Sequence, residues 1–184
     1  MKKTALLFMM SLLLSVVASS CFDNDNNWKD YAEWRELNEQ WLEEQRNRID
    51  ANGDPYFKEV RAEWDGNAYV LMHFFNDTTL TRDNLSPLYT STVDVKYIGY
   101  LCTGEAFDSS YLKTDSVLRM TLTEGNSIEG WSLALQNMHV GDTCEVIIPY
   151  GLAYGTSGYL DIDPYSVLRY NMRLVSVPGY EKEP

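Results

Sequence analysis

Residues 128–148 have the sequence IEGWSLALQNMHVGDTCEVII, in which the spacing of apolar residues changes from that of a helix to that of a strand. Its first half places apolar side chains at helical spacing, which predicts a short helix over 128–137. The Gly-Asp pair at 141–142 then indicates a turn. Apolar residues alternate after the turn with the period of a strand, at Cys144, Val146 and Ile148. The stretch therefore combines a helix of about two turns with a strand.

The flanking sequence repeats the strand period on both sides. Further strands are predicted at 68–75, 93–98, 118–122 and 168–174. The tetrapeptide Cys102-Thr103-Gly104-Glu105 indicates a hairpin turn, and residues 151–166 form a loop rich in Gly and Tyr. Several antiparallel strands around one short helix define an α+β sheet domain.

A separate amphipathic helix is predicted at residues 28–49. Its apolar side chains recur three and four positions apart and include Trp28, Trp34 and Trp41. Such a tryptophan stripe serves a partner, packs on the neighbouring domain or packs on a twin helix. Because an isolated helix of this length is only marginally stable in water, we expect docking or self-association, with a homodimer through 28–49 as one form.

The N-terminal segment has the pattern of an export signal. Two lysines precede an uncharged apolar run at 5–17, which is too short to span a bilayer comfortably. Small residues then lead into Cys21, and this junction resembles the lipobox of bacterial lipoproteins. We therefore expect a signal peptide at 1–20, a lipidated Cys21 and an acidic tether at 21–27. The alternatives are an uncleaved anchor or a free thiol.

Composition excludes several classes of function. The 184 residues carry a net charge of −12, which is opposite to that of a nucleic-acid binder. Three cysteines and two histidines are too few and scattered for a structural zinc site, and no phosphate loop or nucleophile elbow is present. We expect no metal and no cofactor. His73 and His139 are interpreted as structural, and Cys102 and Cys144 as free thiols.

Several short motifs, taken together and in order, resemble those of FKBP-type peptidyl-prolyl isomerases. Tyr97-Ile98-Gly99 followed by residues 104–110, GEAFDSS, is similar to the Y-x-G…DG-x-x-FDSS pattern of that family. The other matching segments are 128–131 (IEGW), 138–142 (MHVGD), 148–149 (IP), 153–158 (AYGTSG) and 162–168 (IDPYSVL). Each motif is weak alone, whereas the ordered set is specific.

The resemblance implies a strongly twisted antiparallel half-barrel wrapped around one short helix. It implies an isomerase domain at 67–178, preceded by a helical segment at 28–66 and followed by a tail at 179–184. The family's pocket lies between helix and sheet. By motif, its catalytic positions are Tyr97, Phe107, Asp108, Ile128, Trp131, Tyr154 and Tyr170. The implied substrate-binding positions are Leu118, Ser127, Tyr159 and Ile162.

Some of these positions depart from the family pattern. Leu118 stands where an aromatic residue is frequent, Tyr159 replaces a frequent His, and Ser127 replaces a usual Val. Asp163 replaces the first of two prolines. These departures bear on specificity more than on the existence of the pocket.

The resemblance implies an enzyme, a peptidyl-prolyl cis-trans isomerase that acts on proline-containing polypeptides. Combined with the leader, it suggests assistance to the folding of exported chains in the cell envelope, on a lipid anchor in the outer membrane. The alternatives are an FKBP-like chaperone or interaction module with little isomerase activity, and a structural surface lipoprotein.

Overall fold

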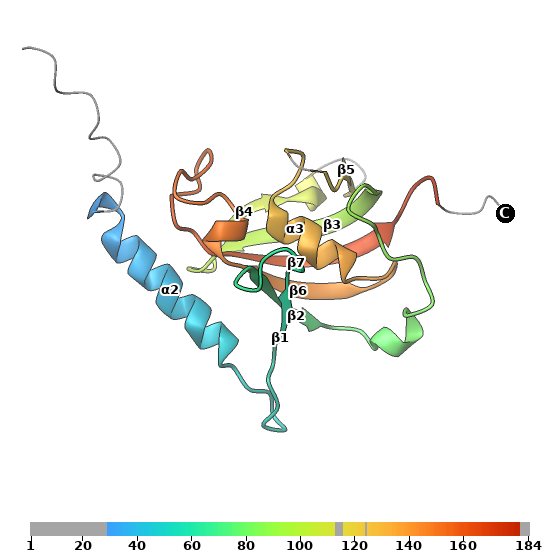
Figure 1. The fold of residues 1–184 in the computed structure, drawn as a ribbon, viewed down its shortest axis with the longest axis horizontal. Coiled ribbons are helices and arrows are strands. Elements are labelled where there is room, and N and C mark those ends of the chain that lie inside the picture. The colour runs from blue at the N-terminus through green and yellow to red at the C-terminus, as the bar shows by residue number, and fades with distance from the viewer. Residues whose placement is uncertain (1–28, 113–115, 124, 181–184) are drawn as a thin grey trace, which may run out of the picture. The chain divides into compact units, whose positions relative to one another are not determined.

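The computed structural model describes residues 29–112, 116–123 and 125–180 (Figure 1). The predicted leader 1–20, Cys21, the tether 21–27 and Trp28 lie outside these residues. The chain divides into two compact units, Met1–Ala32 and Glu33–Pro184. Of the first unit, only residues 29–32 are described. Within the described ranges, no helix combines the length and apolarity that a membrane crossing requires.

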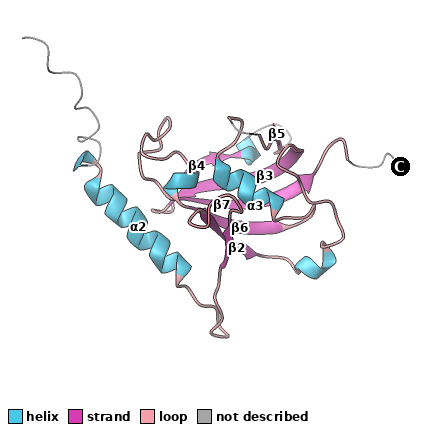
Figure 2. Ribbon diagram, in the orientation of Figure 1, coloured by secondary structure: helices cyan, strands magenta, loops and turns pink. Residues whose placement is uncertain are grey.

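One antiparallel sheet dominates the second unit (Figure 2). In the described residues its strands are β1 (Lys58–Arg61), β2 (Tyr69–Phe74), β3 (Thr92–Leu101), β4 (Ala106–Ser109), β5 (Leu118–Thr121), β6 (Thr143–Ile148) and β7 (Leu168–Ser176). The strand order is β1-β2-β6-β7-β3-β4, and β5 also pairs with β3. The expected α+β class, with its antiparallel sheet and short helix, is therefore confirmed.

Helix α3 (Glu129–Gln136) packs on one face of this sheet. The helix buries Trp131, Leu133 and Leu135 against inward-facing residues of the strands, among them Val146 and Met172. A Cβ atom on Gly130 would lie 2.3 Å from Ile148 Cγ2, so only glycine lets the helix approach β6 this closely. The main core lies between α3 and the sheet.

Helix α2 (Ala32–Arg46) packs against the opposite face of the sheet. Trp41 and Leu42 contact a small buried cluster that includes Leu71 and Ile147. These two strand residues alternate with neighbours that face α3, so they point away from it. In the described residues, the tryptophan stripe therefore docks on the chain's own sheet.

Two side-chain hydrogen bonds fix the position of α2 on the domain. Asn38 is fully buried, and its Oδ1 accepts a hydrogen bond of 2.8 Å from the backbone N–H of Val167. Trp34 Nε1 donates to Ser166 Oγ at 3.1 Å. The periodicity indicated Trp34 and Trp41 but gave no signal for Asn38.

The predicted helix boundary at residue 49 is wrong, because α2 ends at Arg46. The carboxylate of Asp50 accepts hydrogen bonds from the backbone N–H groups of Asn52 and Asp54, at 2.8 and 3.0 Å. This turn returns the chain so that Ile49 bridges to Pro55. These side-chain hydrogen bonds of Asp50 compete with the backbone hydrogen bonds that a longer helix would make.

The strands predicted from alternation are confirmed as β2, β3, β5, β6 and β7, and the short helix as α3. Two strands were not predicted. β1 lies in a segment expected to be helical, and it pairs with β2 so that the sheet begins at Lys58. β4 pairs with the end of β3 and completes the hairpin that Cys102-Thr103-Gly104-Glu105 predicted.

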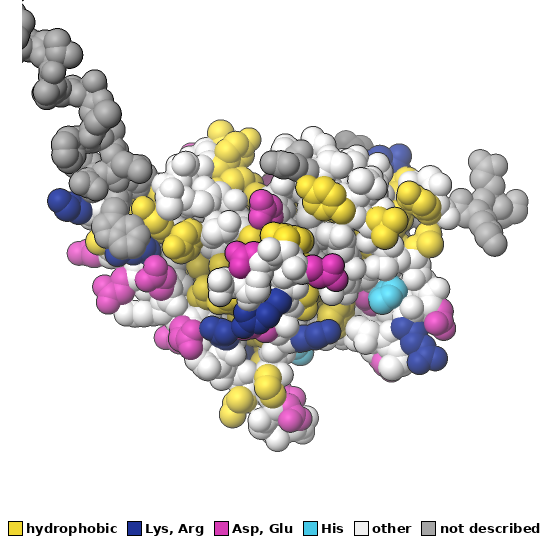
Figure 3. Space-filling model, in the orientation of Figure 1, with side chains coloured by type: hydrophobic (Ala, Val, Ile, Leu, Met, Phe, Trp, Pro, Cys, Tyr) yellow, Lys and Arg dark blue, Asp and Glu magenta, His cyan; other side chains and the backbone are white. Residues whose placement is uncertain are grey.

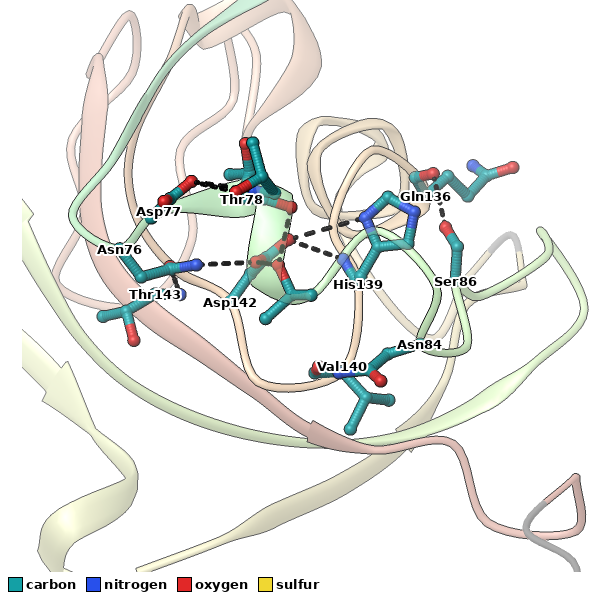
Figure 4. Close-up of polar contacts among 12 residues, drawn as sticks. Asn76, Asp77, Thr78, Asn84, Ser86, Gln136, His139, Val140, Asp142 and Thr143 are labelled. Atoms are coloured by element: carbon teal, nitrogen blue, oxygen red, sulfur yellow. Dashed lines mark hydrogen bonds and ion pairs between the residues drawn. The ribbon is translucent and has the colours of Figure 1, made fainter.

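A buried carboxylate fixes the turn after α3 (Figure 4). Asp142 is fully buried and accepts hydrogen bonds from Asn76 Nδ2 at 3.0 Å and Thr81 Oγ1 at 2.5 Å. The backbone N–H of His139 donates to the same carboxylate at 2.8 Å. The predicted turn thus also ties down the long loop between β2 and β3, and His139 lies in this network.

Candidate active site

An aromatic pocket lies between the N-terminal end of α3 and the sheet. The cavity has a volume of about 160 Å³. The residues that line it are Tyr97, Asp108, Leu118, Met120, Asn126, Ser127, Ile128, Trp131, Tyr154 and Tyr170. They come from β3, β4, β5, β7, α3 and the loops beside them, so the fold assembles the pocket from segments far apart in the sequence.

Three nearly buried rings meet edge to face in the pocket. The Trp131 ring lies 5.1 Å from that of Tyr170 and 4.8 Å from that of Tyr97, with interplanar angles of 88° and 82°. Phe107 continues the array from β4, with its ring 5.7 Å from Tyr170 at 82°. Edge-to-face contacts of this kind are favourable and hold each ring in one orientation. The aromatic wall of the pocket is therefore rigid.

The glycine of the Tyr97-Ile98-Gly99 motif makes this array possible. A Cβ atom on Gly99 would lie 2.7 Å from Phe107 Cζ and 2.8 Å from Tyr170 Cε1. Any larger residue would therefore displace the two rings from each other.

One charged side chain stands at the rim of the pocket. Asp108 is exposed, and its Oδ2 accepts a hydrogen bond of 2.5 Å from Tyr97 Oη. Its Oδ1 accepts from the backbone N–H of Ser109 at 2.7 Å. The carboxylate thus orients the Tyr97 phenol while part of it stays open to solvent.

The phenols of the pocket are held in their neutral form. Burial raises the pKa of Tyr97 above its ordinary value, and the hydrogen bond to Asp108 raises it further. Burial is also the main cause that raises the pKa of Tyr154, and it raises that of Tyr170 well above the usual range. The three hydroxyls are protonated at neutral pH, so none of them supplies a base there.

The first turn of α3 borders the pocket through Ile128. This residue caps the helix in an extended conformation, and its carbonyl accepts the backbone N–H of Trp131 at 3.0 Å. The backbone N–H groups that precede Trp131 in this first turn have no carbonyl partner within the helix. A carbonyl group bound in the pocket would meet the positive end of the helix.

The structure brings most of the predicted site residues together. Eight of them line the cavity: Tyr97, Asp108, Leu118, Ser127, Ile128, Trp131, Tyr154 and Tyr170. Phe107 packs behind the wall against Tyr170, and Tyr159 stacks on Tyr154 with ring centroids 4.9 Å apart. Ile162 is buried in the core rather than on the cavity surface, although its neighbours form the loop beside the pocket.

Two lining residues were missed by sequence reasoning. Met120 is two positions from Leu118 on β5 and so points to the same face, a signal that was available. Asn126 lies in a turn and gave no signal.

The other candidate groups lie away from the pocket. His73 Nδ1 contacts the carbonyl of Tyr56 at 2.8 Å, and His139 lies at the Asp142 turn (Figure 4). Cys102 and Cys144 are both free thiols, and burial raises the pKa of each. Over the described residues, no group of three His, Cys, Asp or Glu side chains is close enough to hold a metal ion. The cavity is thus lined by neither a thiol nor an imidazole among the described residues.

Comparison with known proteins identifies this arrangement. The family model described as FKBP-type peptidyl-prolyl cis-trans isomerase matches residues 86–175. FK506-binding protein 1A of Neurospora crassa is 36% identical over 91 residues, which are 49% of this chain and 75% of that protein. The chain therefore belongs to the family of FKBP-type peptidyl-prolyl cis-trans isomerases.

Two further relatives define the extent of the similarity. Macrophage infectivity potentiator of Trypanosoma cruzi is 39% identical over 93 residues, and the match covers 50% of this chain and 46% of that protein. The crystal structure of a peptidyl-prolyl cis-trans isomerase from Pseudomonas syringae pv. tomato is 26% identical with a TM-score of 0.61. This comparison covers 80% of this chain and 95% of that one. The chain thus spans less than half the length of the T. cruzi relative.

Proposed function

We propose that this chain catalyses the cis–trans isomerisation of X–Pro peptide bonds. The observation that carries the proposal is the rigid pocket of Tyr97, Trp131 and Tyr170, in which the phenols stay neutral and which is lined by neither a thiol nor an imidazole among the described residues. A proline ring is small, apolar and uncharged, and it is compatible with a pocket of these properties. Isomerisation breaks no covalent bond, so it requires no nucleophile.

The physical basis is catalysis by environment. Rotation about an X–Pro bond has a barrier of roughly 18–20 kcal/mol because twisting removes amide resonance. The planar amide is more dipolar than the twisted amide, so an apolar pocket disfavours the planar form relative to the transition state. A thousandfold acceleration requires the barrier to fall by only about 4 kcal/mol.

Within this proposal each pocket residue has a distinct role. The backbone N–H of Ile128 donates to the substrate carbonyl. Trp131 forms the floor and Tyr170 the wall, and Phe107 supports the Tyr170 ring from behind. Asp108 and Tyr154 orient the rim, with Tyr97 held by Asp108. The substrate-binding positions Leu118, Ser127, Tyr159 and Ile162 shape the cavity and the loop beside it.

The experiment is an isomerisation assay of residues 21–184 on a short X–Pro peptide. We expect catalysed exchange in the wild type and a large loss in Phe107→Ala, with circular dichroism confirming that the variant is folded. A folded wild-type chain that leaves the uncatalysed exchange, which takes tens to hundreds of seconds, unchanged would contradict the proposal.

We also propose that the chain acts in the cell envelope on exported polypeptides, anchored to the outer membrane through lipidated Cys21. Support comes from the basic start, the short apolar run and the small residues before the cysteine. Cys21→Ala should release the protein from the membrane fraction. A variant that remains in that fraction and keeps the lipid-modified mobility would contradict the anchor.

A homodimer through 28–49 remains part of the proposal, restricted to the part of α2 that faces away from the sheet. Leu37 is 46% exposed there, whereas Trp34 and Trp41 contact the domain. Sedimentation of wild type against Leu37→Glu tests it: a dimer that the charge disrupts supports this surface, and a monomeric wild type rules it out.

A second candidate function is the binding of unfolded chains with little isomerase activity. The loop beside the pocket favours it, because Leu160 is 87% exposed next to Tyr159, which stacks on Tyr154. A Leu160→Ser variant that loses suppression of client aggregation but keeps its isomerase rate would support this function.

A further inference from the structure

Two further hollows continue from the aromatic pocket along α3 and the β1–β2 hairpin. The second hollow has a volume of about 500 Å³ and the third about 290 Å³. Ser127 lines both the aromatic pocket and the second hollow. Trp64 and Glu129 line both the second and the third. The three hollows therefore adjoin one another at these residues, and the second and third together are called the path.

An exposed tryptophan stands between the second and third hollows. Trp64 is 59% exposed and lies in the loop at 62–68 between β1 and β2. Backbone hydrogen bonds close this loop, from Ala62 N to Ala68 O at 2.8 Å and from Ala68 N to Asp65 O at 3.0 Å. The ring therefore offers a large apolar surface on a braced support, which lowers the entropy cost of binding against it.

The path is acidic as well as aromatic. Glu63, Asp65 and Glu129 are exposed along it, and no lysine or arginine among the described residues lines either hollow. Arg61 lies beside the loop, where it donates to the carbonyl of Gly66 and is paired with Glu59. Tyr89 adds a second exposed ring to the second hollow. Figure 3 shows carboxylate groups beside hydrophobic side chains at the centre of the view, with Lys and Arg side chains below them. The surface is thus complementary to a chain with apolar and positively charged side chains.

We propose that these two hollows bind the substrate polypeptide beyond its proline and select chains with lysine or arginine near it. The proposal rests on the isomerase function above, since it is the proline in the aromatic pocket that places the chain on the path. A bound chain continues from the pocket at roughly 3.3–3.6 Å per residue, so a few residues reach past Ser127 toward Trp64. Trp64 then contacts the chain, and Glu63 and Glu129 attract its cationic side chains.

The test compares short and extended substrates. The short one is an X–Pro peptide of about four residues. The extended ones are peptides of about ten residues with the same core, flanked by lysines or by glutamates. We expect wild-type kcat/KM to favour the lysine peptide over the glutamate peptide by about fivefold at about 0.05 M salt, and the preference to shrink at about 0.5 M salt.

Two variants locate the preference on the path. Trp64→Ala should lower kcat/KM for the lysine peptide about tenfold more than for the short peptide. The double variant Glu63→Gln, Glu129→Gln should abolish the lysine preference. The matched controls are Tyr180→Ala, an aromatic residue 57% exposed elsewhere, and Asp83→Asn, whose side chain is 92% exposed. Both controls should behave like the wild type.

The outcomes separate this inference from the proposed function. If the short peptide is isomerised but Trp64→Ala affects short and extended peptides equally, the path is wrong and the isomerase function stands. If the short peptide is not isomerised, the isomerase function fails. Binding of the lysine peptide, measured by Trp fluorescence, then tests whether the path binds a polypeptide. Binding weakened by Trp64→Ala then supports it, and binding unaffected by that substitution overturns it.

Discussion

The two ends of helix α3 place a carboxylate group in contrasting settings. At the N-terminal end, Asp108 is exposed at the pocket rim and accepts one phenol and one backbone N–H. At the C-terminal end, Asp142 is fully buried and accepts donors from two loop side chains and a backbone N–H (Figure 4). The Asp108 carboxylate faces a cavity, whereas the Asp142 carboxylate accepts hydrogen bonds from other residues of the chain.

The difference separates stability from ligand binding within one helix. A buried carboxylate requires all its hydrogen bonds, because an unpaired charge in the interior is strongly destabilising. Asp142 is therefore expected to hold the loop between β2 and β3 to the turn after α3. Asp108 costs little to leave partly in water, so it is available to orient a bound group. The predictions below test this division.

The largest effect is expected on stability at the buried end. Asp142→Ala removes the buried carboxylate that accepts from Asn76, Thr81 and the His139 N–H, so three part-buried donors lose this acceptor. The free energy of unfolding, measured by urea denaturation, should fall by about 3 kcal/mol or more. Asp83→Ala, at a side chain that is 92% exposed, should change it by less than about 0.5 kcal/mol. Equal losses of unfolding free energy in Asp142→Ala and Asp83→Ala would contradict the structural role of Asp142.

Substitutions beside the pocket, at the N-terminal end of α3, should lower the isomerase activity. Phe107→Ala removes the ring that supports Tyr170 and should raise the barrier by about 1–3 kcal/mol, measured as a loss of kcat/KM. Trp131→Leu should cost less activity, because a branched apolar floor still excludes water. The activity of folded Asp142→Ala protein, corrected for the unfolded fraction, should stay near that of the wild type. A fully active Phe107→Ala would contradict the role of the aromatic wall.

A site remote from both ends should change stability alone. Asn38→Ala leaves the buried N–H of Val167 without its acceptor, so the free energy of unfolding should fall by about 1–2 kcal/mol. Gln40→Ala, on an exposed position of the same helix, is the control. If Asn38→Ala reduces kcat/KM of the folded enzyme, α2 is coupled to the pocket and the division fails.

The sequence predicts some strands of the sheet and misses others. Strands β2, β3, β5, β6 and β7 are predictable from alternation, because each contributes one face to the main core. β1 and β4 are short edge segments whose sequences, KEVR and AFDS, contain little apolar periodicity. Their pairing is decided by the backbone of the neighbouring strand, which their own residues do not reveal.

The pocket was predicted from ordered motifs rather than from periodicity. An aromatic side chain such as Trp131 has the same sequence signal whether it fills a core or lines a cavity. Asn126 and Asn38 gave no signal, because a polar residue in a turn or on a helix is ordinarily exposed. Their roles depend on partners distant in the sequence, the pocket for Asn126 and Val167 for Asn38.

A smaller effect is expected at alkaline pH. The folded pKa values of Tyr97, Tyr154 and Tyr170 are raised above their ordinary value near 10. These phenols therefore contribute stability that is fully present below about pH 9 and is lost as the pH rises through 10, where the unfolded chain ionises first. Tyr170→Phe should reduce the slope of this loss in denaturation measured from about pH 8 to 11. An unchanged slope would show that burial of Tyr170 does not control it.

Catalysis by the pocket environment is tested by the pH dependence of kcat/KM on a short X–Pro peptide, measured in the wild type and in His139→Ala. His139 lies at the structural end of α3, and alanine keeps the backbone N–H that Asp142 accepts. With neutral phenols and no histidine in the pocket, the rate should be nearly flat between about pH 6 and 8 and equal in the two proteins. A step near pH 6.5 that His139→Ala abolishes would contradict catalysis by an apolar environment.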